Sequence, residues 1–348
     1  MGNNICIIFG EQYSYELLDT LISNNSFDKI YCIFLTEKSF VDRNFYGNII
    51  ALSQDNFNIY QESIDIVYVC ETISKTDNRI IELIKLATKQ GKKIIFAGSS
   101  QNTFTNTLEQ YFKSNILLTQ RTNISAVSIL ILNMCNNTGA LPLELKLYDA
   151  LKEEYKLSVI SSNQAAALFG FTTYNYNPLL YANINSVFMR DYLNQFVKDI
   201  VNFNNAELLI YDFPYSIASP DIITSEAEDI LFENLINAVS PDYIIYLLPV
   251  NRTDTDYIDK ISEYFMHQYM LQINNFVIYD RVFDEVQYSN SHMISTFKCS
   301  ENTKLKISKK ILGSYKIPTF CLWDKLVQHS IIDYMEDYLG NGLQYQVL

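Results

Sequence analysis

Positive charge is scarce in this sequence. Its 348 residues include 26 Lys and Arg against 39 Asp and Glu, which gives a formal net charge of −13. Binding to a nucleic-acid backbone depends on basic side chains, so this balance argues against a nucleic-acid partner.

Long apolar runs are missing as well. None approaches the roughly 20 residues that cross a bilayer, and residues 1–4 lead straight into a strand-like segment and not into a signal peptide. Richness in Asn, Ile and Tyr is typical of an AT-rich bacterial genome. We therefore expect a cytoplasmic bacterial protein without a membrane partner.

The cysteines and histidines lack the spacing of metal ligands, and the cysteines also lack that of a redox pair. Cys6, Cys32, Cys70 and Cys135 lie in or beside strand-like runs, which is typical of buried free thiols. Cys135 stands at a strand-to-helix turn but has no histidine near it in the sequence, so we assign no catalytic residue. We expect no metal site, and no cofactor can be identified.

The sequence also lacks the glycine-rich motifs that bind phosphate. A single Gly10 follows the strand-like residues 5–9, and Gly98 and Ser99 follow residues 93–97. Ligands of open α/β sheets bind at the carboxyl ends of strands, which makes Gly10, Gly98 and Ser99 candidate ligand-binding residues. Ordinary tight turns are the alternative, because one glycine per loop falls short of G-x-G-x-x-G.

The pattern that is present alternates strands with helices, which predicts parallel sheets with right-handed crossovers. We expect an α/β protein with two Rossmann-like domains, over residues 1–120 and 121–290, and a C-terminal extension over 291–348. The extension carries a helix over 324–339 that Gly340 ends, and a local basic patch of Lys298, Lys304, Lys306, Lys309 and Lys310. The expected strands span 5–9, 30–35, 64–70 and 93–97 in the first domain, and 127–132, 157–161, 207–211, 243–248 and 276–279 in the second.

The second domain opens like a P-loop domain, with a buried strand, a polar loop and an amphipathic helix. The residues of a Walker A motif are missing, because Ala140 and Leu141 occupy the positions of its lysine and its magnesium-binding hydroxyl. Backbone amides at the helix start could still bind a small anion. This makes four loop residues candidate ligand-binding residues, while an N-cap for the helix is the alternative. These residues are Asn136, Asn137, Thr138 and Gly139.

Asp212 follows the expected strand over 207–211, where nucleotide hydrolases of this topology hold magnesium through an aspartate. It is a further candidate for ligand binding, and capping of a turn before Pro214 is the alternative.

Residues 171–185 lack the hydrophobic periodicity of a helix or a strand and are rich in Tyr. Long loops of this kind are functional or disordered, and its aromatic content argues against disorder. We expect Tyr174, Tyr176 and Tyr181 to be exposed and to bind a partner. Packing on its own domain, or on a second copy in a homo-oligomer, is the alternative.

Five segments of the second domain resemble a family of accessory proteins from clostridial gene clusters that pair a ribosomally made peptide with a radical-SAM enzyme. The segments are 137–147, 151–160, 168–171, 209–214 and 238–243. The resemblance implies a non-catalytic accessory or adaptor protein in peptide maturation (RiPP biosynthesis), with the precursor peptide and the radical-SAM enzyme as partners. Two alternatives stay open: an enzyme or sensor that binds a nucleotide or phosphate ligand through residues 136–141, and a Rossmann-like enzyme acting at a cleft between the domains.

Overall fold

The computed structural model describes most of the chain and divides it into two compact units. One unit comprises Met1–Ser114 with Gln164–Gly170, and the other comprises Asn115–Asn163 with Phe171–Leu348. The sequence does not predict that residues 164–170 group with the first unit. The described residues are 4–9, 15–23, 27–34, 49–52, 63–70, 78–96, 123–135, 139–180, 185–217, 222, 224–292, 294–311 and 315–345.

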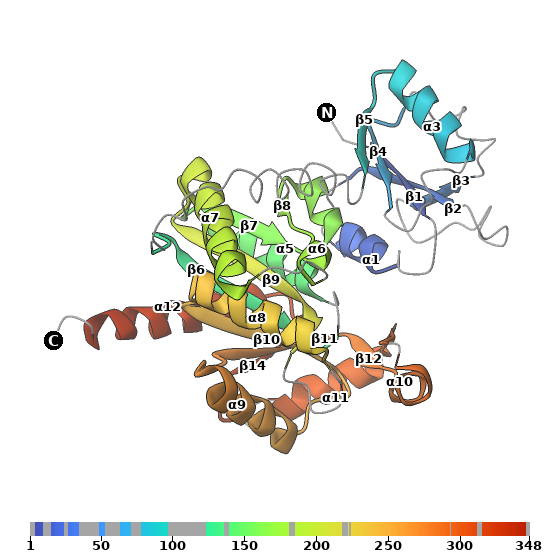
Figure 1. Ribbon diagram of the computed structural model, residues 1–348. Coiled ribbons are helices and arrows are strands. Elements are labelled where there is room, and N and C mark those ends of the chain that lie inside the picture. The colour runs from blue at the N-terminus through green and yellow to red at the C-terminus, as the bar shows by residue number, and fades with distance from the viewer. Residues whose placement is uncertain are drawn as a thin grey trace. The chain divides into compact units, whose positions relative to one another are not determined.

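The first unit holds a five-stranded sheet in the order β3-β2-β1-β4-β5 (Figure 1). All its strand pairs are parallel, as the alternation of strands and helices predicts. Strand β3 is not among the expected strands. The strands are β1 (Asn4–Phe9), β2 (Lys29–Phe34), β3 (Ile49–Leu52), β4 (Ile66–Val69) and β5 (Lys93–Phe96), and the described α-helices are α1 (Tyr15–Ser23) and α3 (Asn78–Lys89). The short helix η4 (Gln164–Phe169) is grouped with this unit.

The second unit holds a seven-stranded parallel sheet in the order β14-β11-β10-β6-β9-β7-β8. The expected α/β class with two parallel sheets is therefore confirmed. The strands are β6 (Val127–Asn133), β7 (Leu157–Ser161), β8 (Thr172–Thr173), β9 (Leu208–Ser216), β10 (Tyr243–Pro249), β11 (Asn275–Tyr279) and β14 (Thr319–Cys321). A separate antiparallel pair joins β12 (Arg281–Phe283) to β13 (Thr296–Lys298).

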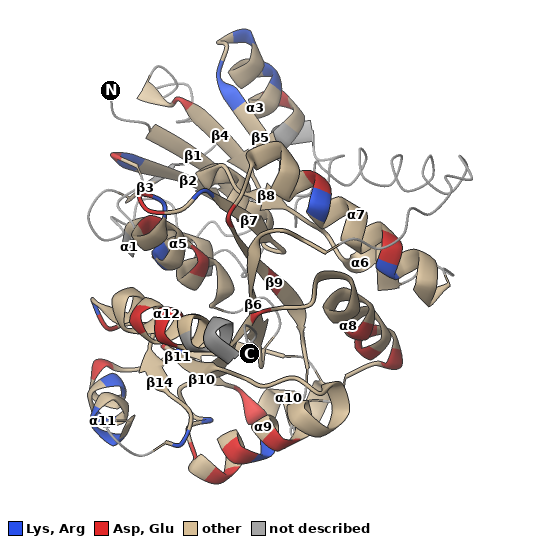
Figure 2. Ribbon diagram, turned by 90° about the vertical axis from the view of Figure 1, so that its left-hand side faces the viewer, with Lys and Arg blue, Asp and Glu red and all other residues tan. Residues whose placement is uncertain are grey.

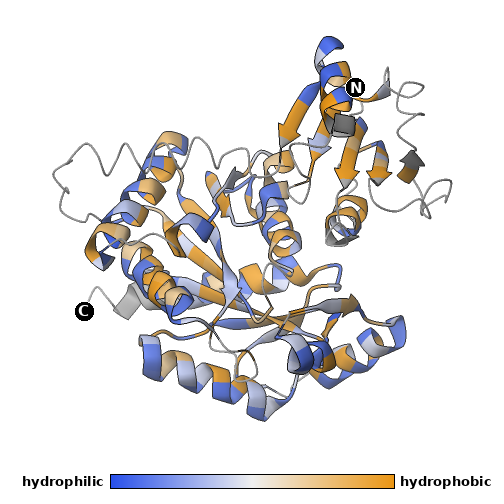
Figure 3. Ribbon diagram, turned by 45° about the vertical axis from the view of Figure 1, so that its right-hand side comes forward, coloured by the Kyte–Doolittle hydropathy of each residue, from blue (hydrophilic) through white to orange (hydrophobic). Residues whose placement is uncertain are grey.

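Helices cover both faces of this second sheet. Figure 2 shows α5 and α12 on one side of the sheet and α7 and α8 on the other. Sheets covered on both faces have apolar strands without alternation, and Figure 3 shows the strands accordingly as largely hydrophobic. The helices of this unit are α5 (Ala140–Leu151), α6 (Asn177–Leu180), α7 (Ser186–Asn204), α8 (Glu226–Val239), α9 (Thr255–Tyr269), α10 (Glu285–Ser291), α11 (Glu301–Ile311) and α12 (Val327–Tyr345).

The segment over 238–243, part of the family resemblance, has a structural role. Ser240 ends α8 in the left-handed region, with φ of 55°. The Asp242 carboxylate then accepts hydrogen bonds from the Ser128 amide at 2.8 Å and the Ser128 hydroxyl at 3.0 Å. The segment thereby sets the pairing of β10 with β6.

The C-terminal residues form part of the second core, so the sheet does not end at residue 290. Strand β14 pairs with β11 at the edge of the sheet. Helix α12 packs beside α5 and buries Ile331 and Met335. Gly340 does not end this helix, which continues to Tyr345. The expected basic patch is partly neutralised, because Lys304 pairs with Asp280 at 3.0 Å.

Candidate functional site

Strand β9 ends farther along the chain than the sequence predicts, and its end forms the floor of a pocket. The register of β6 and β9 shifts after Leu132, so that Asn133 lies opposite Ser216. Both side chains are buried at the carboxyl ends of neighbouring central strands. In open α/β sheets this edge is where ligands bind.

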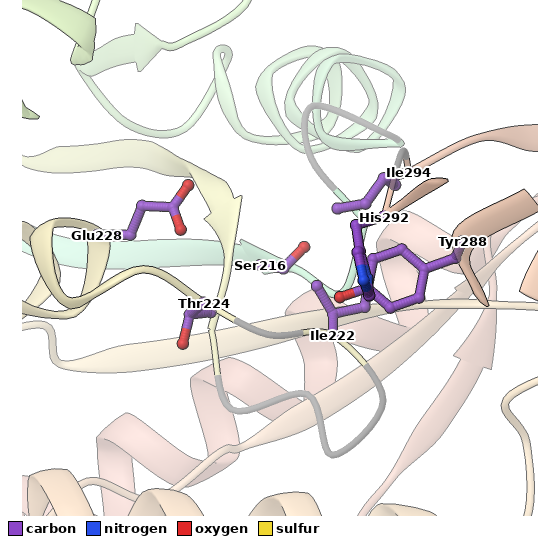
Figure 4. A pocket seen from close by; sticks show the side chains of 7 residues that line it. All are labelled: Ser216, Ile222, Thr224, Glu228, Tyr288, His292 and Ile294. Carbon is purple, nitrogen blue, oxygen red and sulfur yellow. The ribbon is translucent and has the colours of Figure 1, made fainter. Parts of the chain in front are cut away.

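The pocket beyond Ser216 has a volume of about 390 Å³. Its described lining comes from the end of β9, the start of α8 and the region of α10. Figure 4 shows Thr224 and Glu228 on one side of the pocket, opposite the side chains of Tyr288, His292 and Ile294. The lining residues are Ser216, Ile222, Thr224, Glu228, Tyr288, His292 and Ile294.

The first turn of α8 fixes the acidic wall of the pocket. Ser225 and Glu228 form a capping box, in which the Glu228 carboxylate accepts from the Ser225 amide at 2.8 Å and the Ser225 hydroxyl accepts from the Glu228 amide at 3.3 Å. The Thr224 hydroxyl donates to Asp229 at 3.3 Å. Partial burial and, to a smaller extent, the Glu228 charge raise the pKa of Asp229. Glu226, Glu228 and Asp229 make this turn acidic, and the ion pairs of the described residues include none of the three.

The opposite wall is aromatic and is held by α10. The rings of Tyr288 and His292 meet edge to face at 5.6 Å. Asp284 caps the helix by accepting from the Gln287 amide at 2.9 Å, and His292 ends it with φ of 53°. These contacts hold the two rings on the side of the pocket opposite Thr224 and Glu228.

The start of α5 differs from a phosphate-binding loop because the Tyr279 ring packs against it. Gly139 is the N-cap, with φ of 84° and no side-chain hydrogen bond, so the alternative in which an Asn or Thr is the N-cap of this helix is wrong. Ala140 and Leu141 are buried. A Cβ on Gly139 would lie 3.2 Å from the Tyr279 ring, so a larger residue there would require the ring to shift. Asn136, Asn137 and Thr138 lie outside the described residues.

Asp212 lies within β9, fully buried under α5. It therefore does not cap a turn, which corrects the alternative drawn from the sequence. Its carboxylate accepts from the Ser162 amide and the Ser162 hydroxyl, both at 2.5 Å. Burial raises the pKa of Asp212 to about 6, while the bonds from Ser162 oppose the rise.

Glu144 on α5 is a second buried carboxyl group beside Asp212, and sequence analysis missed it. Neither of its carboxyl oxygens makes a hydrogen bond of normal geometry to the described residues. Burial, followed by the charge of Asp212, raises its pKa well above the usual range, and Ser161 opposes this. Glu144 lies four residues after Ala140 and three before Leu147, on the apolar face of α5, and a helical wheel would have shown this.

The expectation that the tyrosines after residue 171 are exposed is wrong for two of the three. Tyr174 and Tyr176 are only 2% and 3% exposed. Their rings meet at 4.5 Å, and the Tyr176 hydroxyl donates to the Asp212 carbonyl at 3.1 Å. The aromatic residues of this stretch fill the core because burial of a ring stabilises more than its exposure. Tyr181 lies outside the described residues.

The remaining ligand candidates are not brought together by the described part of the chain. Gly10, Gly98 and Ser99 lie outside it. Its His, Cys, Asp and Glu residues form no group of three that could hold a metal ion. None of its helices is both long enough and apolar enough to span a membrane. Of the sequence candidates for ligand binding, only Gly139 and Asp212 have a described environment, and neither lines the pocket.

No protein-family model and no curated protein matches the sequence. Among solved structures, a DUF1611 family protein from Anabaena variabilis has a similar fold, with a TM-score of 0.55 at 11% identity over 97% of this chain and 99% of that one. The hydrogenase maturation factor HypB from Archaeoglobus fulgidus gives a TM-score of 0.32 at 13% identity over 62% of this chain and 91% of that one. These likenesses concern the fold alone.

Proposed function

We propose that the protein is a binding protein for a small organic ligand, which it holds in the pocket at the carboxyl end of β9. The observation that carries this proposal is the pocket itself. It lies at the sheet edge where α/β proteins bind ligands, and it combines two isoleucines with several polar groups. A volume of about 390 Å³ suits a molecule of metabolite size.

Hydrolysis of a nucleoside triphosphate is not part of this function. The positions of the Walker A lysine and hydroxyl hold Ala140 and Leu141, which are buried. Asp212 is engaged by Ser162 under α5. We expect no phosphate release from ATP or GTP with magnesium in a malachite-green assay of the purified protein. Turnover that Asp212→Asn abolishes would contradict this expectation.

The binding role is tested with a variant that opens the aromatic wall. His292 has a positive φ of 53°, so His292→Gly removes the imidazole without adding backbone strain. His267→Ala on α9 is the control, because this histidine is exposed and does not line the pocket.

A fragment library is screened by thermal shift, and hits are measured by calorimetry. We expect hits whose affinity falls about fivefold in His292→Gly, since a lost pocket contact costs on the order of 1 kcal/mol, and stays unchanged in His267→Ala. A screen without hits, or hits whose affinity is the same in His292→Gly and the wild type, would contradict the proposal.

The role in peptide maturation stays a prediction from the resemblance. An adaptor that binds the side chain or the terminus of a peptide in this pocket is one form that the proposed function could take.

A further inference from the structure

We infer that the ligand of this pocket carries a positively charged nitrogen, which Glu228 receives, on a compact apolar body. This inference rests on the proposed function and adds the chemical class of the ligand. It follows from the charge, the hydrogen bonds and the shape of the lining.

The charge of the described lining has one sign at neutral pH with histidine neutral. Glu228 is the ionised group among the described lining residues, and none of them is Lys or Arg. Glu226 and Asp229 add two carboxylates in the same turn of α8. The described residues provide no ion-pair partner for Glu228, and Figure 2 shows further acidic residues along α8 and α9. A cation entering the pocket would supply the missing charge.

The start of α8 also disfavours an anion, although helix starts commonly bind one. The capping box occupies the amides of Ser225 and Glu228, and the acidic first turn already offsets the positive end of the helix dipole. A phosphate or carboxylate placed here would meet the Glu228 carboxylate without a basic residue of the described lining to offset it.

One Glu228 oxygen remains for the ligand. Oε2 accepts from the Ser225 amide at 2.8 Å, and a carboxylate has a second oxygen for an ammonium or guanidinium group. Ile222, Ile294 and the Tyr288 ring provide the apolar surface opposite or below it (Figure 4). The pocket therefore combines a carboxylate at one side with space for a ring or an aliphatic body.

The test uses Glu228→Gln, which removes the charge and keeps the capping box, because glutamine serves at this position as well as glutamate. Glu233→Gln is the matched control, since Glu233 is exposed on the same helix and does not line the pocket. Thermal unfolding of both variants checks that the helix start is preserved.

The probes are sets of three compounds with one carbon skeleton, such as 2-phenylethylamine, 2-phenylethanol and phenylacetate, on several aromatic and aliphatic skeletons. An arm with an N-acetylated, C-amidated tripeptide that has a central lysine distinguishes a free amine from a peptide side chain. We expect amines to bind best, and Glu228→Gln to weaken them at least about tenfold, because hydrogen bonds to charged groups are the strong ones. Glu233→Gln should leave them unchanged.

Two outcomes would overturn the inference and leave the pocket as a binding site: carboxylates that bind better than amines, or an amine preference that Glu228→Gln does not change. Failure of every probe and of the fragment library would instead remove the proposed function together with this inference.

Discussion

At the scale of single residues, Glu144 on α5 and Asp212 on β9 are two neighbouring carboxyl groups that are fully buried in the second unit. Asp212 accepts two hydrogen bonds from Ser162, whereas Glu144 makes none of normal geometry to the described residues. The two hydrogen bonds favour the ionised form of Asp212, whereas burial and the Asp212 charge favour the protonated form of Glu144. Burial raises both pKa values, so the pair destabilises the folded state wherever the unfolded chain would ionise.

The sign of this effect predicts how stability depends on pH. Between about pH 4 and the raised pKa values, the folded protein binds more protons than the unfolded chain, so its free energy of unfolding falls as pH rises. A pKa of about 6 for Asp212 corresponds to on the order of 3 kcal/mol at most. The raised pKa of Glu144 adds to this fall.

Glu144→Gln should therefore make the second unit more stable at pH 8 than the wild type and flatten the pH dependence, because the amide carries no charge at any of these pH values. Urea unfolding at pH 5 and pH 8 measures this. The control is Glu153→Gln, an exposed residue just after α5. Equal pH slopes in the two variants would contradict the assignment.

At the scale of elements, the contact between Gly139 and Tyr279 joins the start of α5 to the end of β11. Gly139→Ala places a Cβ at φ of 84° and 3.2 Å from the ring. The backbone cost is about 1–2 kcal/mol, and the ring contact adds to it. We expect the cost to fall by about 1 kcal/mol in a Tyr279→Ala background, in a double-mutant cycle by urea unfolding. An identical cost in both backgrounds would show that the ring gives way.

Elements are also the scale at which the sequence was most informative. Apolar runs identified the strands that became β1, β2, β4 to β7 and β9 to β11, because strands buried on both faces are apolar throughout. The apolar pattern did not predict the short β3 or the part of β9 after Tyr211. In that part of β9, Pro214 and the register shift between β6 and β9 interrupt the pattern. Five pocket residues come from loops or from α10, which lacks a buried face, so periodicity gave no signal for them.

At the scale of the whole molecule, the main error of the sequence-based prediction was to treat residues 291–348 as an extension outside the second domain. A short strand of three residues, β14, attaches it to β11, and α12 buries Ile331 on the core. Ile331→Ala should cost about 2–5 kcal/mol in urea unfolding. Leu326→Ala, at a side chain 66% exposed in the same segment, should cost under about 0.5 kcal/mol. Equally small losses of stability in the two variants would contradict a place for these C-terminal residues in the core.

The position of a cationic ligand beside Glu228 is tested most directly by a crystal structure of the protein with an amine hit from the fragment screen. We expect ligand density between Glu228 and Tyr288, above Ser216, with the nitrogen at hydrogen-bond distance from the Glu228 carboxylate. Density at residues 136–141, at the start of α5, would contradict it and would favour the phosphate-loop alternative.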